Sequence, residues 1–414
     1  MTGIGIVSSL GLSLSKFWGN MVNGKSGIKK ISGFDAKHLP IQIAGEIDAQ
    51  SLCFAEKEIG LDPDDTIPKG IRFALLATKM ALLDAGLDGS AADCNMGLYL
   101  GSHILPNILS QNLHVFFDNR KDLYSDEFKF HFLKQMNQCD SFNVGLNIAK
   151  NFHLTESINL IHASCASSAQ AIGEAFHLIK HGQKDIMLCG GVDSLITFEG
   201  ISFFNSLGVL SKNPNPQLAS RPFDKNRNGF VLGEGAGLVV LESAESARKR
   251  GAKIWCEVKG YANMSEAYHI TSPDPAGYVQ AASIKAALQE AMLDVSQIDL
   301  INAHGTSTVV NDRMETSVIK QTFGQRAYRI PITANKSMIG HTVTAAGAIE
   351  LISTIQSVVY NVIPPTVNYE HKDPDCDLDY VPNSARTQKV DNAISNTFAF
   401  GGQDVCLVVG KSSL

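Results

Sequence analysis

An alternation of buried strands with a small-residue helix, between residues 158 and 191, is the feature that most constrains the fold of this chain. Residues 158–162 have strand character, residues 164–181 read as a helix rich in alanine, serine and glycine, and residues 185–191 are a second apolar strand. A strand, a helix and a strand in this order are typical of a mostly parallel sheet in an α/β protein. The sequence therefore predicts an α/β fold.

The second half of the chain repeats this order. Its predicted elements are a helix over 279–291, a strand over 299–303, a short strand over 332–335 and a small-residue helix over 342–360. In the first half, a helix over 71–85 that stops at Gly86 and a buried strand over 95–101 precede the alternation.

Each half also places its small-residue helix directly after a reactive side chain, which is Cys165 in the first half and His341 in the second. This pairing predicts an internal duplication, with an N-terminal half over 1–249 and a C-terminal half over 250–414. The irregular, polar and aromatic segment 102–140 is expected to be a divergent cap or insertion over the core.

The composition of the 414 residues is that of a soluble globular protein, with 44% hydrophobic and 18% charged residues. Its 41 acidic and 35 basic residues give a net charge of −6, which offers no support for a nucleic-acid or anionic-membrane partner. No run of 18 or more uncharged apolar residues occurs, so no membrane span is expected. The apolar N-terminus predicts a folded strand and turn rather than a secretory signal.

Eight cysteines are scattered along the chain without any C-x-x-C pair, at positions 53, 94, 139, 165, 189, 256, 376 and 406. Their spacing is unlike that of a disulfide scaffold or a zinc site. Most are expected to be buried small hydrophobic residues in a reducing, cytoplasmic compartment.

Cys165 differs from the other cysteines in its context, since it lies where a strand turns into a helix within the segment HASCASSA. A thiol at a helix N-terminus is near the positive end of the helix dipole, which favours the thiolate. That effect is worth about 0.3–1 kcal/mol, whereas one pKa unit corresponds to about 1.36 kcal/mol. The dipole alone cannot make a strong nucleophile, so Cys165 needs polar partners.

Two histidines and a lysine are the candidate partners. His304 ends a predicted strand, where open α/β sheets bind ligands, and His341 follows Lys336 just before a helix. Two imidazole N–H groups suit the enolate that forms when a malonyl thioester loses CO2, because losing one such donor typically costs about 2.7–4 kcal/mol. The helix N-terminus should keep His341 neutral. Lys336 needs an acidic partner, for which Asp312 and Glu315 are the candidates.

Five sequence blocks together resemble the elongating β-ketoacyl-acyl-carrier-protein synthases of the thiolase-like superfamily. They are the Cys165 block, Arg221–Asp224 with Gly229–Ala236, the His304 block, Lys336–His341 and Ser395–Gly402. The order and spacing of the blocks match over nearly the whole chain, apart from about 102–140. The resemblance implies a thiolase-like, five-layered αβαβα fold with duplicated mixed sheets.

The resemblance also implies an activity, namely the decarboxylative condensation of an acyl thioester with malonyl-acyl-carrier protein. Cys165 would accept the acyl chain from the phosphopantetheine arm of an acyl carrier protein. His304 and His341 would bind the malonyl thioester carbonyl and stabilise the enolate, which attacks the acyl-Cys165 thioester.

Further residues take supporting roles by the same resemblance. Lys336 would order the site, paired with Glu315. The backbone amides of Cys165 and Phe400 would form the acyl oxyanion hole, and Phe400 would gate the acyl pocket. The pantetheine channel would be lined by Thr271, Thr306 and Thr308. No metal or diffusible cofactor is implied, and the expected partners are an acyl carrier protein and a second subunit, in a homodimer or in a heterodimer with a chain-length-factor-like homologue.

Several positions depart from the usual pattern of the family. Ala163–Ser164 replaces Thr-Ala before the nucleophile, Val309–Asn311 replaces Pro-Leu-Gly, and Asp404 replaces a common Asn. The run Asn311–Thr316 looks more like the ketosynthases of type II polyketide systems than like housekeeping fatty-acid enzymes. Asn205 stands where a basic carrier-docking residue is often found; the remaining basic candidates for docking are Lys69, Arg72 and Lys212.

Four alternatives stay open at this point. A degradative thiolase needs a second reactive cysteine near the C-terminus, and Cys406 lies in an apolar strand without that motif. An initiating synthase of the Cys-His-Asn kind would have Asn in place of His341. A non-condensing chain-length partner would lack the active cysteine. Housekeeping fatty-acid elongation is the fourth, and specialised polyketide or polyene synthesis is favoured over it.

Overall fold

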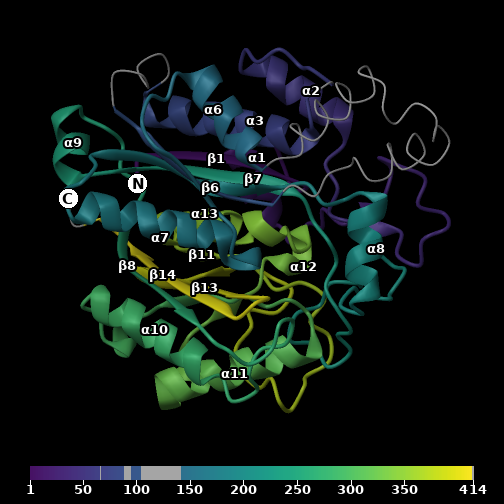
Figure 1. The fold of residues 1–414 in the computed structure, drawn as a ribbon. Coiled ribbons are helices and arrows are strands. Elements are labelled where there is room, and N and C mark those ends of the chain that lie inside the picture. Colours follow the sequence, from purple (N-terminus) through teal and green to yellow (C-terminus); the bar gives the residue numbers. More distant parts are fainter. Residues whose placement is uncertain (66, 88–94, 104–140, 413–414) are drawn as a thin grey trace.

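Five stacked layers make up the part of the chain that the computed structural model describes, which is residues 1–65, 67–87, 95–103 and 141–412 (Figure 1). Outer helices, a sheet, two central helices, a second sheet and further outer helices follow one another from top to bottom in Figure 1. The predicted αβαβα architecture is confirmed. Of the expected cap over 102–140, residues 104–140 lie outside the described residues.

The upper sheet has five strands in the order β1-β7-β6-β4-β5. Their bounds are β1 Gly3–Ser8, β7 Gly235–Glu242, β6 Ile186–Asp193, β4 Gly97–Ser102 and β5 Ile158–Ile161. β4 is parallel to both β5 and β6, whereas β7 is antiparallel to β6 and to β1. The sheet is therefore mixed.

The lower sheet has the order β10-β9-β13-β14-β8. Its strands are β10 Ile332–Thr333, β9 Leu300–Asn302, β13 Asn392–Ala399, β14 Gln403–Gly410 and β8 Glu257–Ser265. β9 is parallel to β10 and β13, and β14 is antiparallel to β13 and β8. Read from β5 and from β10, the two sheets share one pattern of directions and one chain order, so the topology confirms the predicted duplication.

The helices form the other three layers. The upper sheet is covered by α2 Ala49–Glu58, α3 Lys69–Ala85 and α6 Phe142–Phe152, and the lower sheet by α10 Tyr278–Glu290 and α11 Val309–Phe323. The central layer consists of α7 Ser167–Lys180 and α13 Ala346–Tyr360. Shorter elements are α1 Leu14–Val22, α8 Phe198–Ser206, α9 Ala244–Lys249, α12 Lys336–Ile339, and the ladders β2 Lys29–Lys30 with β3 Ile43–Ala44 and β11 Val362–Ile363 with β12 Arg386–Thr387.

Small residues allow the two central helices to approach each other and the sheet closely. A Cβ atom on Gly347 of α13 would lie 2.6 Å from the Cβ of Ala169 on α7. A Cβ atom on Gly101 of β4 would lie 2.4 Å from the backbone nitrogen of Ser168. Both distances are far below van der Waals contact, so packing explains why small residues stand at these points of closest approach.

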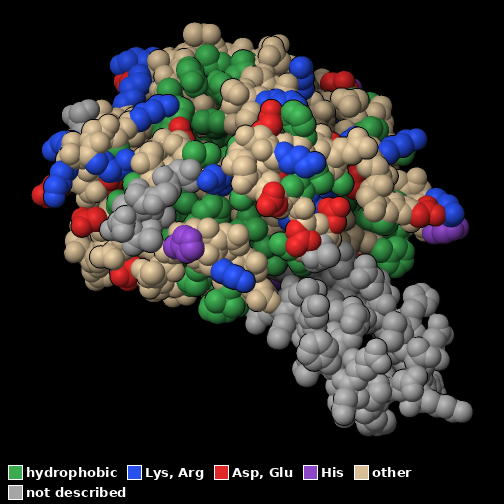
Figure 2. All heavy atoms as spheres, turned by 90° about the horizontal axis from the view of Figure 1, so that it is seen from above, with side chains coloured by type: hydrophobic (Ala, Val, Ile, Leu, Met, Phe, Trp, Pro, Cys, Tyr) green, Lys and Arg blue, Asp and Glu red, His purple; other side chains and the backbone are tan. Residues whose placement is uncertain are grey.

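The segment Val343–Tyr360 is long and apolar enough to cross a membrane by length and composition alone, but it is 89% buried inside the protein. Its place in the central layer marks it as a core helix. On the face seen in Figure 2, basic and acidic side chains are interspersed among neutral and hydrophobic ones. That face shows no large patch of one charge sign.

Candidate active site

Cys165 lies in a strained turn that the sequence did not reveal. A short 3-10 turn, η2 Ser164–Ala166, joins β5 to α7, so the α-helix begins two residues after the cysteine. Ser164 has a φ of +49°, which is uncommon for a residue with a side chain. The Ser167 hydroxyl secures the turn, because it accepts from the Ala163 N–H at 2.9 Å and donates to the Ser164 carbonyl at 2.7 Å.

The matching turn of the second half has the same geometry. There η5, Val343–Ala345, precedes α13, and Val343 has a φ of +43°. A positive φ is a clear outlier for a β-branched residue. Strain of this kind persists only where the surrounding structure imposes it and is concentrated at functional sites.

The thiol of Cys165 is protonated at neutral pH. Cys165 is 5% exposed, and burial raises its pKa to about 12, although the charge of Lys336 and the N–H of Phe400 oppose that rise. Phe400 lies in the turn between β13 and β14, with its backbone N–H directed at the sulfur. The protonated thiol agrees with the expectation that the helix dipole alone does not make Cys165 a strong nucleophile.

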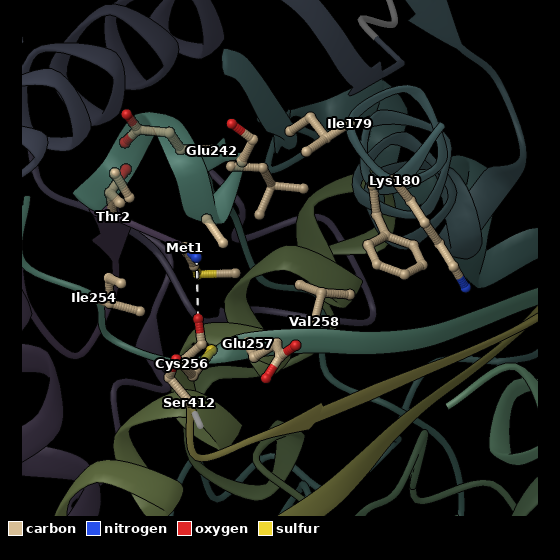
Figure 3. A pocket seen from close by; sticks show the side chains of 15 residues that line it. Met1, Thr2, Ile179, Lys180, Glu242, Ile254, Cys256, Glu257, Val258 and Ser412 are labelled. Atoms are coloured by element: carbon tan, nitrogen blue, oxygen red, sulfur yellow. Dashed lines mark hydrogen bonds between the residues drawn. The ribbon is translucent and has the colours of Figure 1, made fainter. Parts of the chain in front are cut away.

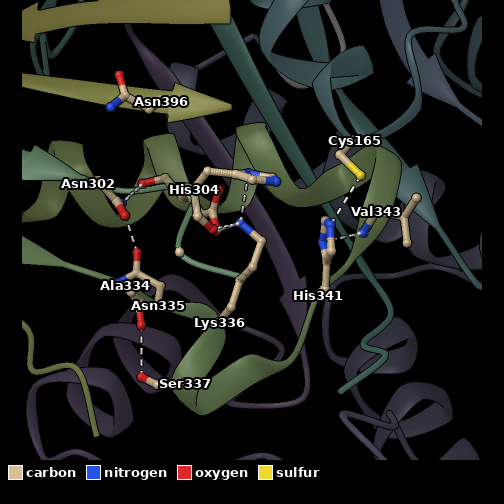
Figure 4. Close-up of polar contacts among 12 residues, drawn as sticks. Cys165, Asn302, His304, Ala334, Asn335, Lys336, Ser337, His341, Val343 and Asn396 are labelled. Carbon is tan, nitrogen blue, oxygen red and sulfur yellow. Dashed lines mark hydrogen bonds and ion pairs between the residues drawn. The ribbon is translucent and has the colours of Figure 1, made fainter. Parts of the chain in front are cut away.

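His341 faces the thiol directly. Its Nε2 lies 3.1 Å from Cys165 Sγ, and its Nδ1 accepts the backbone N–H of Val343 at 3.2 Å (Figure 4). Because Nδ1 accepts a hydrogen bond, the ring proton is on Nε2 and points at the sulfur. Burial, more than the nearby charge of Lys336, lowers the pKa of His341 well below 6.5. His341 is therefore a neutral donor, as predicted, and desolvation rather than the helix N-terminus is the main reason that it stays neutral.

His304 has the same tautomer for a different reason. Its Nδ1 lies 3.4 Å from the Nζ of Lys336, and an ammonium group can only donate (Figure 4). Nδ1 is therefore the acceptor and Nε2 carries the proton. Burial is the largest cause of the lowered pKa of His304, followed by the charge of Lys336 and by His341. The ring centroids of His304 and His341 are 5.5 Å apart at an interplanar angle of 82°.

The acidic partner of Lys336 is Glu350, so the predicted pairing with Glu315 is wrong. The Nζ of Lys336 forms a buried ion pair with Glu350 of α13 and donates to the His304 carbonyl at 2.7 Å. Glu315 is occupied elsewhere, since its two oxygens accept the N–H groups of His304 and Gly305, each at 2.8 Å. Burial raises the pKa of Glu315 to about 7.

A sequence signal for Glu350 did exist. It is the single charged residue of α13, in the otherwise neutral run AGAIELISTIQSVVY, and it is 1% exposed. A lone acid in a buried helix needs a cation to pair with. Burial raises its pKa, and the charge of Lys336 opposes that rise.

Asp312, the second predicted partner, also lies away from Lys336. Its carboxylate accepts the Phe223 N–H at 2.8 Å and lies 3.5 Å from the Nε of Arg227. Asp312 therefore fastens the Arg221–Asp224 block to α11. Its role is to hold the loop that carries this block.

A cavity of about 300 Å³ connects these groups to the surface. Its walls include the catalytic candidates Cys165, His304, His341 and Phe400, and the predicted channel residues Thr271, Thr306 and Thr308. The hydroxyls of Thr306 and Thr308 lie 2.9 Å apart. All seven sequence-predicted residues of this set thus line one cavity.

A second cavity, of about 190 Å³, lies between α7, α9 and the start of β8 (Figure 3). The amino group of Met1 donates to the Cys256 carbonyl there at 3.0 Å, and burial raises the pKa of the Cys256 thiol to about 11. Among the described residues that line this cavity there is no histidine. Within the described residues, no three side chains of His, Cys, Asp or Glu are grouped as for a metal ion.

The fold and the geometry of the site together fit an enzyme of acyl transfer. A buried thiol, two neutral imidazole donors and a turn amide converge at the end of one cavity. The chain belongs to the β-ketoacyl synthase family. Residues 1–247 match the model "Beta-ketoacyl synthase, N-terminal domain", and residues 255–370 match "Beta-ketoacyl synthase, C-terminal domain".

Similar proteins include both polyketide and fatty-acid enzymes. "Putative polyketide beta-ketoacyl synthase 1" of Streptomyces cyaneus is 36% identical, over 100% of this chain and 98% of that protein. "3-oxoacyl-[acyl-carrier-protein] synthase 2" of a Synechocystis strain is 37% identical, over 99% and 97%. A solved ketosynthase, titled as bound to a hexaketide and in complex with its type II polyketide acyl-carrier protein, is 32% identical with a TM-score of 0.88, over 100% and 98%. The chain is thus an acyltransferase that condenses acyl with malonyl units.

Proposed function

We propose that Cys165 holds the growing acyl chain and that the two histidines activate malonyl-acyl-carrier protein, in a type II polyketide, polyene or specialised fatty-acid pathway. The observation that carries this proposal is the convergence of two Nε2–H donors beside a buried thiol, with both tautomers set by the acceptor role of Nδ1. A fixed donor pair can stabilise an oxyanion without reorganising during the reaction.

The first step is the transfer of the acyl chain onto Cys165. The sulfur attacks the acyl thioester on the pantetheine arm, an S–C bond forms at Cys165, and the pantetheine sulfur leaves as the new thiol. One thiol replaces another, so no net proton is consumed. The amides of Cys165 and Phe400 would hold the oxyanion. Nε2–H of His341 would stabilise the Cys165 thiolate, whose proton ends on the leaving pantetheine sulfur.

The second step is the condensation. The malonyl thioester loses CO2, and Nε2–H of His304 and His341 stabilise the enolate oxygen. The enolate carbon attacks the acyl carbonyl, a C–C bond forms, and the C–S bond to Cys165 breaks. The Cys165 sulfur leaves as a thiolate and takes up one proton from solvent, which restores the thiol. Both imidazoles are buried and neutral, so each can donate an Nε2–H hydrogen bond to the enolate oxygen.

Lys336 supports this step through His304. Its ammonium group contacts Nδ1 and the backbone carbonyl of His304, and its charge is balanced by Glu350. Glu315 holds the backbone on either side of the same histidine. We assign positioning roles to Lys336, Glu350 and Glu315, and a gating role to the half-buried Phe400 ring.

Of the basic residues expected to dock an acyl carrier protein, Lys212 is the best candidate, because it is exposed. Arg72 is 6% exposed and paired with Glu56, and Lys69 pairs with the buried Glu234. The cavity mouth adds an apolar rim, since Val309 is 41% and Val310 is 49% exposed. A carrier would therefore meet an apolar rim with the exposed Lys212 as its basic contact among the described residues.

A second subunit would pair along β5. This strand is an edge of the upper sheet, all four of its residues are half-buried, and within the described residues it pairs with β4 alone. An unpaired edge of this kind is a template for another strand. The second subunit is either a copy of the chain or a chain-length-factor-like homologue, and light scattering of the purified chain alone tests the first case. The six described cysteines are free, which fits a cytoplasmic location.

The polyketide assignment rests on Asn311–Thr316 and on the similarity to the polyketide ketosynthases, whereas the comparable similarity to the Synechocystis enzyme keeps housekeeping elongation as the alternative. The test is a reconstituted assay with malonyl-acyl-carrier protein. Cys165 should accept poly-β-ketoacyl or polyenoyl thioesters faster than saturated ones. A preference for saturated chains would support housekeeping elongation, and decarboxylation without any chain extension would support a non-condensing partner subunit.

A further inference from the structure

Asp404 is a buried acid in the wall of the catalytic cavity for which the reaction steps provide no role. It lies on β14, four residues after Phe400, and is 1% exposed. Its side chain lines the same cavity as Cys165, and among the described residues its Oδ2 has no hydrogen-bond partner. A buried carboxylate oxygen without a hydrogen-bond partner destabilises the folded state when it is charged, which favours a proton on Asp404.

The neighbours of Asp404 contain more acceptors than donors. Glu266, at the end of β8, is 7% exposed and accepts the Gln280 side-chain amide at 2.8 Å and the Asp274 N–H at 3.2 Å. The same Gln280 side chain also reaches the Asp404 carboxyl, while its own Oε1 lacks a partner within the described part of the chain. One amide thus serves two carboxyl groups. A proton on Asp404 supplies the donor that this cluster lacks.

The two carboxyl groups belong to the two sides of a joint next to the nucleophile. Glu266 N–H donates to the Gly402 carbonyl at 2.8 Å, and Gly401 N–H donates to the Ile270 carbonyl at 2.8 Å. These bonds tie segment 266–270 to the turn that carries Phe400. A Cβ atom on Gly402 would lie 2.2 Å from the Glu266 carbonyl oxygen, so the joint is tightly packed. Any force between Asp404 and Glu266 therefore acts on the Phe400 turn.

We propose that Asp404 is a positioning residue that works in its protonated form: with one proton between them, Asp404 and Glu266 keep segment 266–270 against the Phe400 turn, and loss of that proton weakens the oxyanion site. The inference rests on the proposed role of the Phe400 amide in acyl transfer. When both groups are charged, two carboxylates with one shared amide repel each other across the joint. The Phe400 N–H then loses its alignment with the Cys165 sulfur.

The charges around Asp404 support a switch in the alkaline range. Burial and the negative charge of Glu266 raise the pKa of Asp404 to about 8. The titratable groups that face Asp404 come from the segment after β8 and are Glu266 and, further out, His269 and Asp274. The other elements packed against Asp404 contribute uncharged residues, which are Gln280 and Ser283 of α10 and Phe398 of β13. The nucleophile does not titrate in this range, because burial raises the pKa of Cys165 to about 12.

The experiment compares the pH dependence of acyl transfer to Cys165 in four full-length proteins between pH 6.5 and 9.5. They are the wild type, Asp404→Asn, Asp404→Ala, and Asp62→Asn as a control at an exposed carboxyl far along the chain. Transfer from an acyl thioester is measured by intact-protein mass. Asparagine keeps the shape of aspartate and a permanent donor, so it mimics the protonated acid, whereas alanine removes both.

Because thiolate formation at Cys165 raises the rate with pH in every protein, each rate is compared with that of Asp404→Asn at the same pH. The wild type and Asp62→Asn should fall at least fivefold behind Asp404→Asn between pH 7.5 and 9.5. Asp404→Asn should transfer at a rate comparable to that of the wild type at pH 7.5 and show the full rise expected from thiolate formation up to pH 9.5, and Asp404→Ala should be slower than Asp404→Asn at every pH. The proposal is overturned if Asp404→Asn follows the wild-type profile, or if Asp404→Ala matches the wild type. Glu266→Gln is the second variant, to be used if Asp404→Ala does not fold, and its rate should also keep pace with that of Asp404→Asn up to pH 9.5.

The melting temperature of the same proteins separates this proposal from the proposed function. The folded state holds a proton on Asp404 that the unfolded chain releases near pH 4, so stability falls as pH rises toward about 8. The wild type should therefore melt progressively below Asp404→Asn as pH increases. If that difference appears while no acyl transfer occurs at any pH, the role in acyl transfer fails and only the proton on Asp404 stands; equal melting curves overturn the proton itself.

Discussion

The imidazole of His341 lies 3.1 Å from the sulfur of Cys165, although the two residues are 176 positions apart in the chain. Cys165 lies within the turn that follows β5 of the upper sheet, and His341 lies just before the matching turn that follows β10 of the lower sheet. The contact therefore exists only where the two central helices α7 and α13 pack against each other. In the proposed reaction, the N-terminal half would supply the nucleophile and the C-terminal half the donor.

Replacing Cys165 should separate the two steps of the reaction. Cys165→Ala should abolish condensation in the reconstituted carrier assay, because no group remains to hold the acyl chain. Cys165→Gln should also abolish condensation while CO2 release from malonyl-acyl-carrier protein continues, because the two donors are untouched. Condensation by Cys165→Ala would refute the assignment of the nucleophile, and loss of CO2 release in Cys165→Gln would contradict the division of labour.

Removing one enolate donor should slow decarboxylation alone. In the Cys165→Gln background, His304→Ala should reduce CO2 release by about 10²–10³-fold, which corresponds to about 2.7–4 kcal/mol for one oxyanion donor. The pH profile is a second readout, since both histidines have a pKa well below 6.5 and should stay neutral donors at pH 6. A new acid loss centred near pH 6.5 in the Cys165→Gln protein would show that one histidine titrates normally.

The pKa of about 12 for Cys165 can be measured by alkylation. Only the thiolate reacts, so the rate with iodoacetamide should rise about tenfold per pH unit between pH 7 and 10, without a plateau. The modified peptide is identified by mass, with Cys165→Ala as the control for the other cysteines. A rate that levels off near pH 8 would mean that the thiol is activated in the free enzyme.

Neutralising Glu350 should destabilise the whole protein. Glu350→Gln leaves the Lys336 ammonium buried without a counter-charge, and breaking a buried ion pair in this way typically costs about 3–5 kcal/mol. Urea unfolding should show that loss, and the exposed Glu370→Gln should show almost none. A change below about 1 kcal/mol for Glu350→Gln would mean that the ion pair is not the main partner of Lys336.

The α/β alternation, the duplication and the candidate reactive groups could be predicted because they follow from local patterns, whereas the five layers were predicted only from the family resemblance. Small-residue helices after Cys165 and His341, and strands ending at His304, are visible in the chain itself. The partner of Lys336 could not be chosen from helical spacing. Glu315 and Glu350 are both buried acids near it, and the choice depends on which carboxylate is already filled by backbone N–H groups.

The turn before Cys165 is a second property that the sequence could not supply. Ser and Val rarely adopt a positive φ, so the sequence gives no sign of this conformation at Ser164 or Val343. The conformation arises because tertiary packing imposes it. The surroundings of Asp404 are similar. The sequence marks the residue as unusual, while its shared amide and its neighbour Glu266 appear only once β8 and β14 pair.

Because Gly347 approaches Ala169 closely, the geometry of the active site depends on the distance between the two halves. Only 2.6 Å would separate Ala169 from a methyl group added at Gly347, so Gly347→Ala has to push α13 away from α7. The displacement would pass directly into the gap between sulfur and imidazole, because both helices begin at the catalytic turns. A single methyl group in the core would thus slow the reaction although every side chain of the active site is still present.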